Sequence, residues 1–156
     1  MLIYEIPGRG DIEIENIVFD YNGTIAVDGK ILEGVKEGLL ELEKYANIYI
    51  LTADTYGTVE KECNDIDVKV LTFPQQNAGE SKRDIVKKLC GEKTLCVGNG
   101  FNDIPMFKEA ILSIAVVEGE GASGKLFIHA DIVAKSILEV IEIILNKNKI
   151  KATLRN

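Results

Sequence analysis

The order of apolar and polar residues along the chain predicts an α/β fold. Strand-like runs, several of them continuously apolar as in buried parallel strands, occur at 2–6, 11–19, 47–51, 68–73, 93–97, 111–117 and 132–134. Helical patterns lie between most of them, at 34–45, 56–64, 80–89, 103–110 and 135–145. Because strands that alternate with helices form parallel sheets, we expect a doubly wound, mainly parallel sheet with helices on both faces.

Turn residues predict two β-hairpins near the start of the chain. Pro7-Gly8-Arg9-Gly10 separates the first two runs and predicts an antiparallel hairpin that leads directly into Ile17–Phe19. Asp28-Gly29, a strong two-residue hairpin signal, predicts a small flap that follows soon after. Ser81 is a candidate cap for the helix at 80–89, and no element is assigned to the basic tail 147–156.

Composition narrows the class of protein and its partners. A chain of 156 residues, 46% hydrophobic and 28% charged, is expected to form a single globular domain over 1–156. The net charge of -7 argues against a nucleic-acid partner, because nucleic-acid binders present a basic face. We expect no membrane partner, because no apolar stretch has the length of a membrane span and no signal peptide is visible.

The number and spacing of the cysteines suggest a reducing cellular compartment. Cys63, Cys90 and Cys96 show neither CxxC spacing nor an even count. They are interpreted as free thiols in a reducing environment, so we expect a cytoplasmic protein.

Polar residues follow several of the apolar runs. Asp20 comes directly after Ile17–Phe19 and is followed by the turn signal Asn22-Gly23. Thr52-Ala53-Asp54 and the segment 98–103 (GNGFND) end two later runs, and Ser81-Lys82 lies between them. Open α/β sheets bind ligands at the carboxyl ends of their strands. A lone Asp there is most simply a turn residue, but the four stretches together favour a functional site.

In this order the four stretches resemble the motifs of the haloacid dehalogenase (HAD) superfamily of phosphohydrolases. They are similar, in turn, to its aspartate-nucleophile motif, its Thr/Ser motif, its lysine and its acidic metal motif. The resemblance covers most of the chain and is closest to the phosphorylation domain of P-type ATPases, with its DKTGT, TGD, lysine and GDGxND motifs. The chain is therefore identified as a small soluble P-type-ATPase-like hydrolase. Because 25–51 and 52–82 are short intervals, it resembles a HAD-like Rossmannoid core without a cap, a nucleotide-binding domain or transmembrane segments.

The resemblance implies a role for each matching residue. Asp20 would be the nucleophile that forms an aspartyl phosphate. The Thr52 hydroxyl would bind a phosphoryl oxygen, and Lys82 would neutralise the charge that develops there, with Arg83 as an alternative lysine-like residue. The residues implied to bind the substrate are Asn22, Gly23, Thr52, Ala53, Lys82 and Asn102. The implied partner is a small phosphorylated substrate.

The implied cofactor is Mg²⁺, which prefers oxygen ligands. By resemblance its ligands are Asp20, the backbone carbonyl of Asn22, Asn99 and Asp103. Most members carry Asp at the position of Asn99, and an amide oxygen brings no charge. The metal would therefore depend more strongly on the carboxylates of Asp20 and Asp103.

Asn22 also departs from the usual motif, in which a second Asp protonates the leaving oxygen and then activates water. Asn cannot exchange a proton in either role. P-type ATPases have Thr at this position, and their aspartyl phosphate persists. The sequence thus favours a phosphatase, phosphotransferase or ATPase that acts on good leaving groups, with Asp54 as a candidate substitute base.

Other interpretations remain open. The chain could be a catalytically weakened core that senses phosphate or supports a partner, because Asn22 and Asn99 replace two acids. The segment 119–125 satisfies GxxxxGK, but Leu126 lacks the hydroxyl that a nucleotide-binding loop needs there. His129, the only histidine, is expected to be a packed or surface residue. An open site benefits from cover that excludes water, so a homo-oligomer is expected, with the flap at Asp28-Gly29 near the interface.

Overall fold

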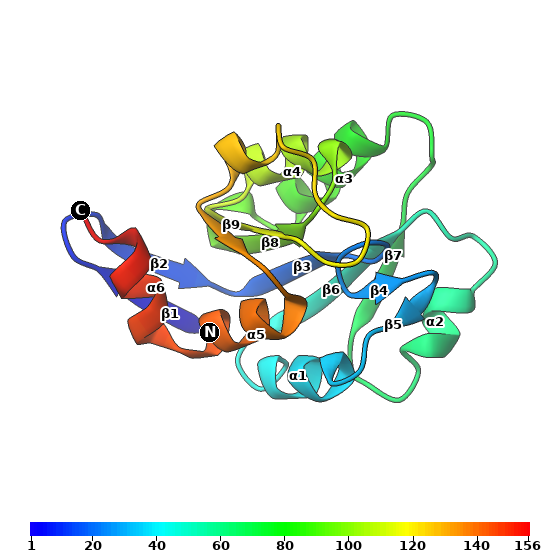
Figure 1. Ribbon diagram of the computed structural model, residues 1–156, viewed down its shortest axis with the longest axis horizontal. Coiled ribbons are helices and arrows are strands. Elements are labelled where there is room, and N and C mark those ends of the chain that lie inside the picture. The colour runs from blue at the N-terminus through cyan, green and yellow to red at the C-terminus, as the bar shows by residue number, and fades with distance from the viewer.

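A computed structural model describes residues 1–156, and at its centre lies a six-stranded parallel sheet (Figure 1). The strands lie in the order β10-β9-β8-β3-β6-β7. Their bounds are β3 (Asn16–Asp20), β6 (Asn47–Thr52), β7 (Lys69–Thr72), β8 (Thr94–Gly98), β9 (Leu112–Val116) and β10 (Ile132–Ala134). Successive strands extend the sheet from β3 first to one side and then to the other, and every pairing is parallel. The predicted doubly wound parallel sheet is confirmed.

Helices cover both faces of this sheet (Figure 1). They are α1 (Val35–Leu42), α2 (Thr58–Glu62), α3 (Ala78–Lys88), α4 (Ile104–Glu109) and α5 (Ile137–Leu145). The five residues of β3 are all buried, and alternate side chains enter different cores. Ile17 and Phe19 pack in the core that includes α1 and α5, whereas Val18 packs with side chains of α3 and α4. The continuous apolar run is therefore the consequence of burial on both faces.

The first hairpin is separate from β3, the strand that ends at Asp20, contrary to the prediction of one strand over 11–19. β1 (Leu2–Ile6) and β2 (Gly10–Ile14) form their own antiparallel sheet, and the chain leaves it at Glu15 before β3 begins. The basic tail forms α6 (Lys147–Leu154), whose Ile150 and Leu154 pack in the core shared with the hairpin. The Tyr4 hydroxyl of β1 also donates to the carbonyl oxygen of Ile144, at 2.7 Å.

The small flap forms as expected. It consists of β4 (Ala26–Val27) and β5 (Lys30–Ile31), joined by Asp28 and Gly29. Both turn residues have positive φ angles, 53° and 78°, as a type I′ hairpin turn requires. Between β3 and β6 the chain forms only this flap and α1, so no cap domain is inserted there.

Two further points concern helices. α3 begins at Ala78, with Asn77 rather than Ser81 at its N-cap. No helix of the chain combines the length and the apolar character needed to cross a lipid bilayer.

Candidate active site

Three charged side chains meet at the carboxyl end of β3. Asp20 is the last residue of this strand, Lys82 comes from α3, and Asp103 ends the short 3₁₀ helix η2 (Phe101–Asp103) that follows β8. The Lys82 ammonium donates to Asp20 Oδ1 at 2.9 Å, to Asp103 Oδ1 at 2.8 Å and to Asn102 Oδ1 at 2.9 Å. An ammonium group has three protons, so Lys82, which is 1% exposed, is fully satisfied in the interior.

The electrostatics of this cluster favour a bound cation. Burial and the nearby Asp103 carboxylate raise the pKa of Asp20, and the Lys82 ammonium only partly opposes them. Burial alone would lower the pKa of Lys82, but the Asp103 and Asp20 carboxylates outweigh it and raise that pKa. One ammonium thus faces two carboxylates, which leaves the cluster with excess negative charge when Asp20 is ionised.

The residue next to Lys82 lies outside the cluster. Arg83 is partly exposed and pairs with Asp84, at 3.1 Å, on the surface of α3. Of the two basic candidates in this stretch, the structure therefore brings only Lys82 to Asp20.

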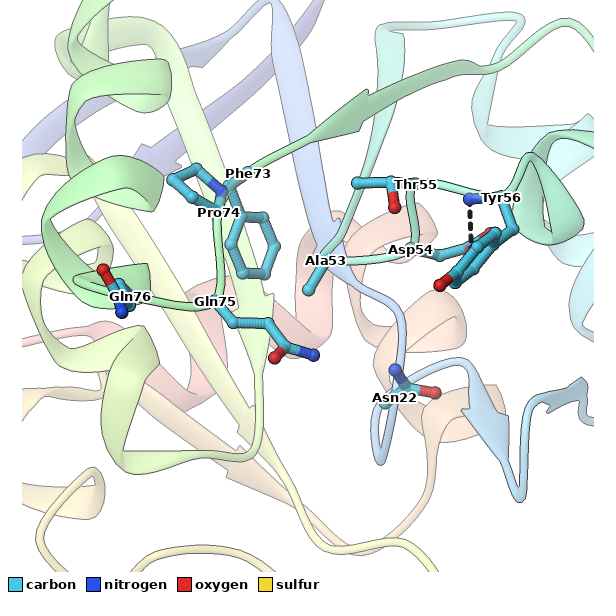
Figure 2. A pocket seen from close by; sticks show the side chains of 9 residues that line it. All are labelled: Asn22, Ala53, Asp54, Thr55, Tyr56, Phe73, Pro74, Gln75 and Gln76. Atoms are coloured by element: carbon cyan, nitrogen blue, oxygen red, sulfur yellow. Dashed lines mark hydrogen bonds between the residues drawn. The ribbon is translucent and has the colours of Figure 1, made fainter.

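Thr52 and Asp54 follow β6, the neighbour of β3. The Thr52 hydroxyl accepts the Asp54 N–H at 3.1 Å, so its own proton can still be donated to a ligand. The Asp54 carboxylate accepts from the N–H group of Tyr56 at 3.0 Å (Figure 2) and from that of Val59 at 3.1 Å. These N–H groups lower the pKa of Asp54. A carboxylate held in this turn with a lowered pKa is poorly suited to protonate a leaving group.

The 98–103 loop is organised by Asp103, whose side chain is completely buried. Its Oδ2 accepts the N–H groups of Asn99, at 3.1 Å, and Gly100, at 2.9 Å, while its Oδ1 accepts from Lys82. A Cβ at Gly98 would lie 2.5 Å from Asp103 Oδ2, so this turn requires glycine. Both oxygens of Asp103, a sequence-predicted metal ligand, therefore have partners in the protein.

Asn99 connects this loop to two others. Its Nδ2 donates to the carbonyl oxygen of Gly121 at 3.0 Å, and its Oδ1 accepts from the Thr24 hydroxyl at 3.3 Å. Thr24 lies just before the flap, and Gly121 lies in the 117–126 loop that follows β9. The sequence-predicted metal loop is thus tied to both of its neighbours through one side chain.

A cavity of about 270 Å³ lies over the cluster. It is lined by Asp20, Asn22, Leu51, Thr52, Ala53, Phe73, Lys82, Asn99, Gly100, Asn102 and Glu120. Of the sequence-predicted site residues, only Gly23 and Asp103 are not part of this lining. Gly23 is nevertheless adjacent, because a Cβ built on it would lie 2.4 Å from Asn99 Nδ2. His129 does not line the cavity.

A second, larger pocket adjoins the first and shares Asn22, Ala53 and Phe73 with it. Its volume is about 610 Å³. Figure 2 shows Asn22 and Gln75 pointing into this space from the loops that follow β3 and β7. No lysine, arginine or histidine lines it.

The amino-acid sequence matches a known family. A model described as haloacid dehalogenase-like hydrolase matches residues 2–110, a range that contains Asp20, Thr52, Lys82 and Asp103. The chain belongs to this family of hydrolases.

Individual relatives agree with that assignment. The soluble P-type ATPase-like phosphatase of Methanocaldococcus jannaschii is 28% identical over 147 residues, which cover 90% of this chain and 53% of the relative. The chain thus spans about half the length of that protein.

Solved structures share the fold. The cobalt-bound deoxy-D-mannose-octulosonate 8-phosphate phosphatase of Haemophilus influenzae has a TM-score of 0.72 at 14% identity, over 92% of this chain and 94% of its own. The 3-deoxy-D-manno-octulosonate 8-phosphate phosphatase of Moraxella catarrhalis, in complex with magnesium and phosphate ions, has a TM-score of 0.66 at 18% identity, over 89% and 90% of the two chains. These relatives hold divalent metals, and at such identities the likeness concerns the fold.

The donor atoms of the hydrolase fit a hard divalent cation. The polar side chains around the cavity offer the carboxylates of Asp20 and Glu120 and the amide oxygen of Asn99, with no sulfur or imidazole among them. Such oxygen donors suit Mg²⁺. No group of three His, Cys, Asp or Glu side chains comes together closely enough to hold a metal alone. Backbone or amide oxygens and water would have to complete the coordination, as is usual for Mg²⁺.

Glu120 is the charged cavity residue that sequence reasoning missed. It lies in the GxxxxGK segment, which was weighed only as a nucleotide-binding loop. The signal that could have found it is its position after β9, because β9 neighbours β8 and its carboxyl end opens on the same edge of the sheet.

Proposed function

We propose that this hydrolase is a Mg²⁺-dependent phosphatase or phosphotransferase that acts through an aspartyl phosphate on Asp20. The observation that carries the proposal is the contact between Asp20 and the buried Lys82 ammonium on the floor of a cavity that Thr52 also lines. Burying an ammonium group carries a large desolvation penalty, even when it donates to three acceptors, so such a group contributes little to stability. It suits a site that stabilises charge during a reaction.

Two displacements at phosphorus account for the activity. In the first, a carboxylate oxygen of Asp20 forms a bond to phosphorus while the bond from phosphorus to the leaving oxygen breaks and its electron pair departs with that oxygen. In the second, water or another acceptor attacks phosphorus, loses a proton to solvent, and releases the Asp20 carboxylate. The Thr52 hydroxyl donates to a phosphoryl oxygen in both steps, while the Lys82 ammonium, hydrogen-bonded to Asp20, neutralises the charge that develops on the phosphoryl group and on the Asp20 carboxylate.

Of the four ligands predicted from the sequence, the proposed metal ligands are Asp20, the Asn22 carbonyl and Asn99, and Asp103 supports them from behind. Because both Asp103 oxygens have protein partners, its contribution would be to position the loop and Lys82. Mg²⁺ held there would supply positive charge beside the phosphoryl oxygens. The substrate would contact Asn22, Gly23, Ala53 and Asn102 in addition to the catalytic groups.

Because of Asn22, the rate of the first displacement should depend strongly on the leaving group. It lines both pockets, so it lies on the border where the leaving oxygen would be. Its amide can donate a hydrogen bond there but cannot transfer a proton. The Asp54 carboxylate is held by two backbone N–H groups and is therefore a poor proton donor as well. A site without a proton donor favours substrates whose leaving group departs without protonation.

The larger pocket would receive the rest of the substrate. Its amide, hydroxyl and phenol groups suit a polar leaving group, whereas the absence of a cationic lining residue disfavours a second phosphate. These properties support a small phosphorylated compound over ATP.

The test is covalent trapping. The protein is mixed with Mg²⁺ and phosphorus-labelled acetyl phosphate and quenched in acid, and the label is assayed for release by hydroxylamine, which cleaves acyl phosphates. We expect label on Asp20, no label in Asp20→Asn, and normal labelling of the exposed control Asp84→Asn. Phosphate binding without labelling or turnover would instead support the weakened, phosphate-sensing core.

A further inference from the structure

Glu120 is presented to the cavity by a loop that is fixed at several points. The N–H of Gly121 donates to the carbonyl oxygen of Glu118 at 2.8 Å, and the Ser123 N–H donates to the carbonyl oxygen of Asn99 at 2.8 Å. The Glu118 carboxylate accepts the Ile137 N–H at the start of α5, at 2.7 Å. Glu120 itself is solvent-exposed at the rim of the cavity. The backbone around it is therefore held in place while its side chain can take up a ligand.

Its carboxylate comes close to the sequence-predicted metal ligand Asn99. A Cβ added to Gly23 would lie 2.4 Å from Asn99 Nδ2 and 2.6 Å from Glu120 Oε2. Gly23, with a φ of +80°, thus leaves open the space that the amide and the carboxylate both border. Any larger residue would fill that space.

The charges of the site leave Glu120 without a cation of its own. Its carboxylate makes no salt bridge in the chain, and the ammonium in the cavity, on Lys82, is already shared by Asp20 and Asp103. Two carboxylates that face one cavity repel each other unless a cation lies between them. The amide oxygen of Asn99 can bind a metal ion but brings no negative charge to it.

We propose that Glu120 supplies the second carboxylate of the metal site, in place of the acid that is absent at Asn99. It binds the divalent cation directly or through one of the waters that Mg²⁺ retains. The inference rests on the proposed Mg²⁺-dependent function. It adds a ligand from the loop after β9, about a hundred residues along the chain from Asp20.

The experiment measures metal binding without substrate. Mn²⁺ is titrated into metal-free protein, with free Mn²⁺ followed by electron paramagnetic resonance, and Mg²⁺ is then added as a competitor. Glu120→Gln is compared with wild type and with Glu80→Gln, which makes the same change of charge. Glu80 is exposed and lies two residues before Lys82 on α3, so its side chain points away from the cavity.

We expect Glu120→Gln to weaken Mn²⁺ and Mg²⁺ binding by about 10–100-fold, the range seen when groups that support a metal site are removed. Glu80→Gln should bind as wild type does, and Glu120→Asp should recover part of the affinity. Equal affinity of Glu120→Gln and wild type would overturn the inference, as would a wild-type protein that binds neither metal. Thermal unfolding of each variant checks that it is folded.

The outcomes separate this inference from the proposed function. Weaker metal binding in Glu120→Gln, together with no label on Asp20, would support the metal ligand and refute the aspartyl phosphate. Labelled Asp20 with unchanged metal binding in Glu120→Gln would support the aspartyl phosphate and refute the metal ligand.

Discussion

Replacing Asp20 by Asn should stabilise the metal-free protein although it removes the proposed nucleophile. Burial first, and then the Asp103 carboxylate, raise the pKa of Asp20 from 3.8 to about 7. Each pKa unit corresponds to 1.36 kcal/mol, so keeping Asp20 ionised at neutral pH costs on the order of 3–4 kcal/mol. The Asn amide oxygen can still accept from Lys82, which also keeps Asp103 and Asn102 as acceptors.

The expected gain is smaller than that cost, because an amide is a weaker partner for Lys82 than a carboxylate. We expect Asp20→Asn to raise the free energy of unfolding by about 1–3 kcal/mol at pH 7.5, or the melting temperature by about 2–4 °C per kcal/mol. Urea unfolding in the presence of a metal chelator measures the free energy of unfolding of the variant and of wild type. Asp84→Asn, on the exposed face of α3, should stay within about 0.5 kcal/mol of wild type.

The pH dependence gives an independent check. The folded-state pKa of Asp20 lies above its unfolded value, so the fold is destabilised at a pH where the carboxylate must be ionised. This penalty is complete above pH about 7 and is lost as the pH falls toward 3.8. The stability difference between Asp20→Asn and wild type should therefore shrink as the pH falls from about 7 toward 3.8. A variant less stable than wild type at pH 7.5, or a gap that widens on acidification, would refute this reasoning.

Three other predictions concern the site and the assembly. Asn22→Asp should raise hydrolysis of alkyl monophosphates by about 10²–10⁴-fold and shorten the lifetime of the phospho-enzyme, and an unchanged dependence of rate on leaving-group pKa would show that another residue already supplies the proton. Lys82→Met should abolish labelling of Asp20 and destabilise the fold by about 3–5 kcal/mol, because two buried carboxylates lose their cation, whereas Arg83→Met should do neither. The open site should be covered in a homo-oligomer with the flap at Asp28-Gly29 near its interface, and a monomer in light scattering would contradict this.

Periodicity predicted the sheet because its central strands are buried on both faces and therefore carry an unbroken apolar signal. It failed where the signal was local or weak. The break at Glu15 separates two strand-like runs without a Gly or Pro, so 11–19 resembled one strand. α6 buries only Ile150 and Leu154 among basic and polar neighbours, which is too sparse for a periodic pattern.

The site was less accessible to the sequence than the sheet. Asp20 and Thr52 end buried strands, so their position at the sheet edge follows from strand ends alone. Lys82 could be chosen over Arg83 only by resemblance, because adjacent residues on a helix point in different directions and the sequence does not say which side meets the sheet. The position of Glu120 after β9 places it at the same edge of the sheet. Its approach to Asn99, however, depends on contacts between loops far apart in the chain, which no local pattern encodes.

The side chain of Asn99 restricts the order in which substitutions can accumulate. Its Nδ2 donates to the carbonyl oxygen of Gly121, so an Asp at this position would set a carboxylate oxygen against that carbonyl. An acid at position 99 would thus loosen the loop that carries Glu120. The amide at 99 and the glutamate at 120 are therefore expected to show epistasis. A lineage could move from one charge arrangement to the other only by changing both residues or by passing through a poorly metallated intermediate sequence.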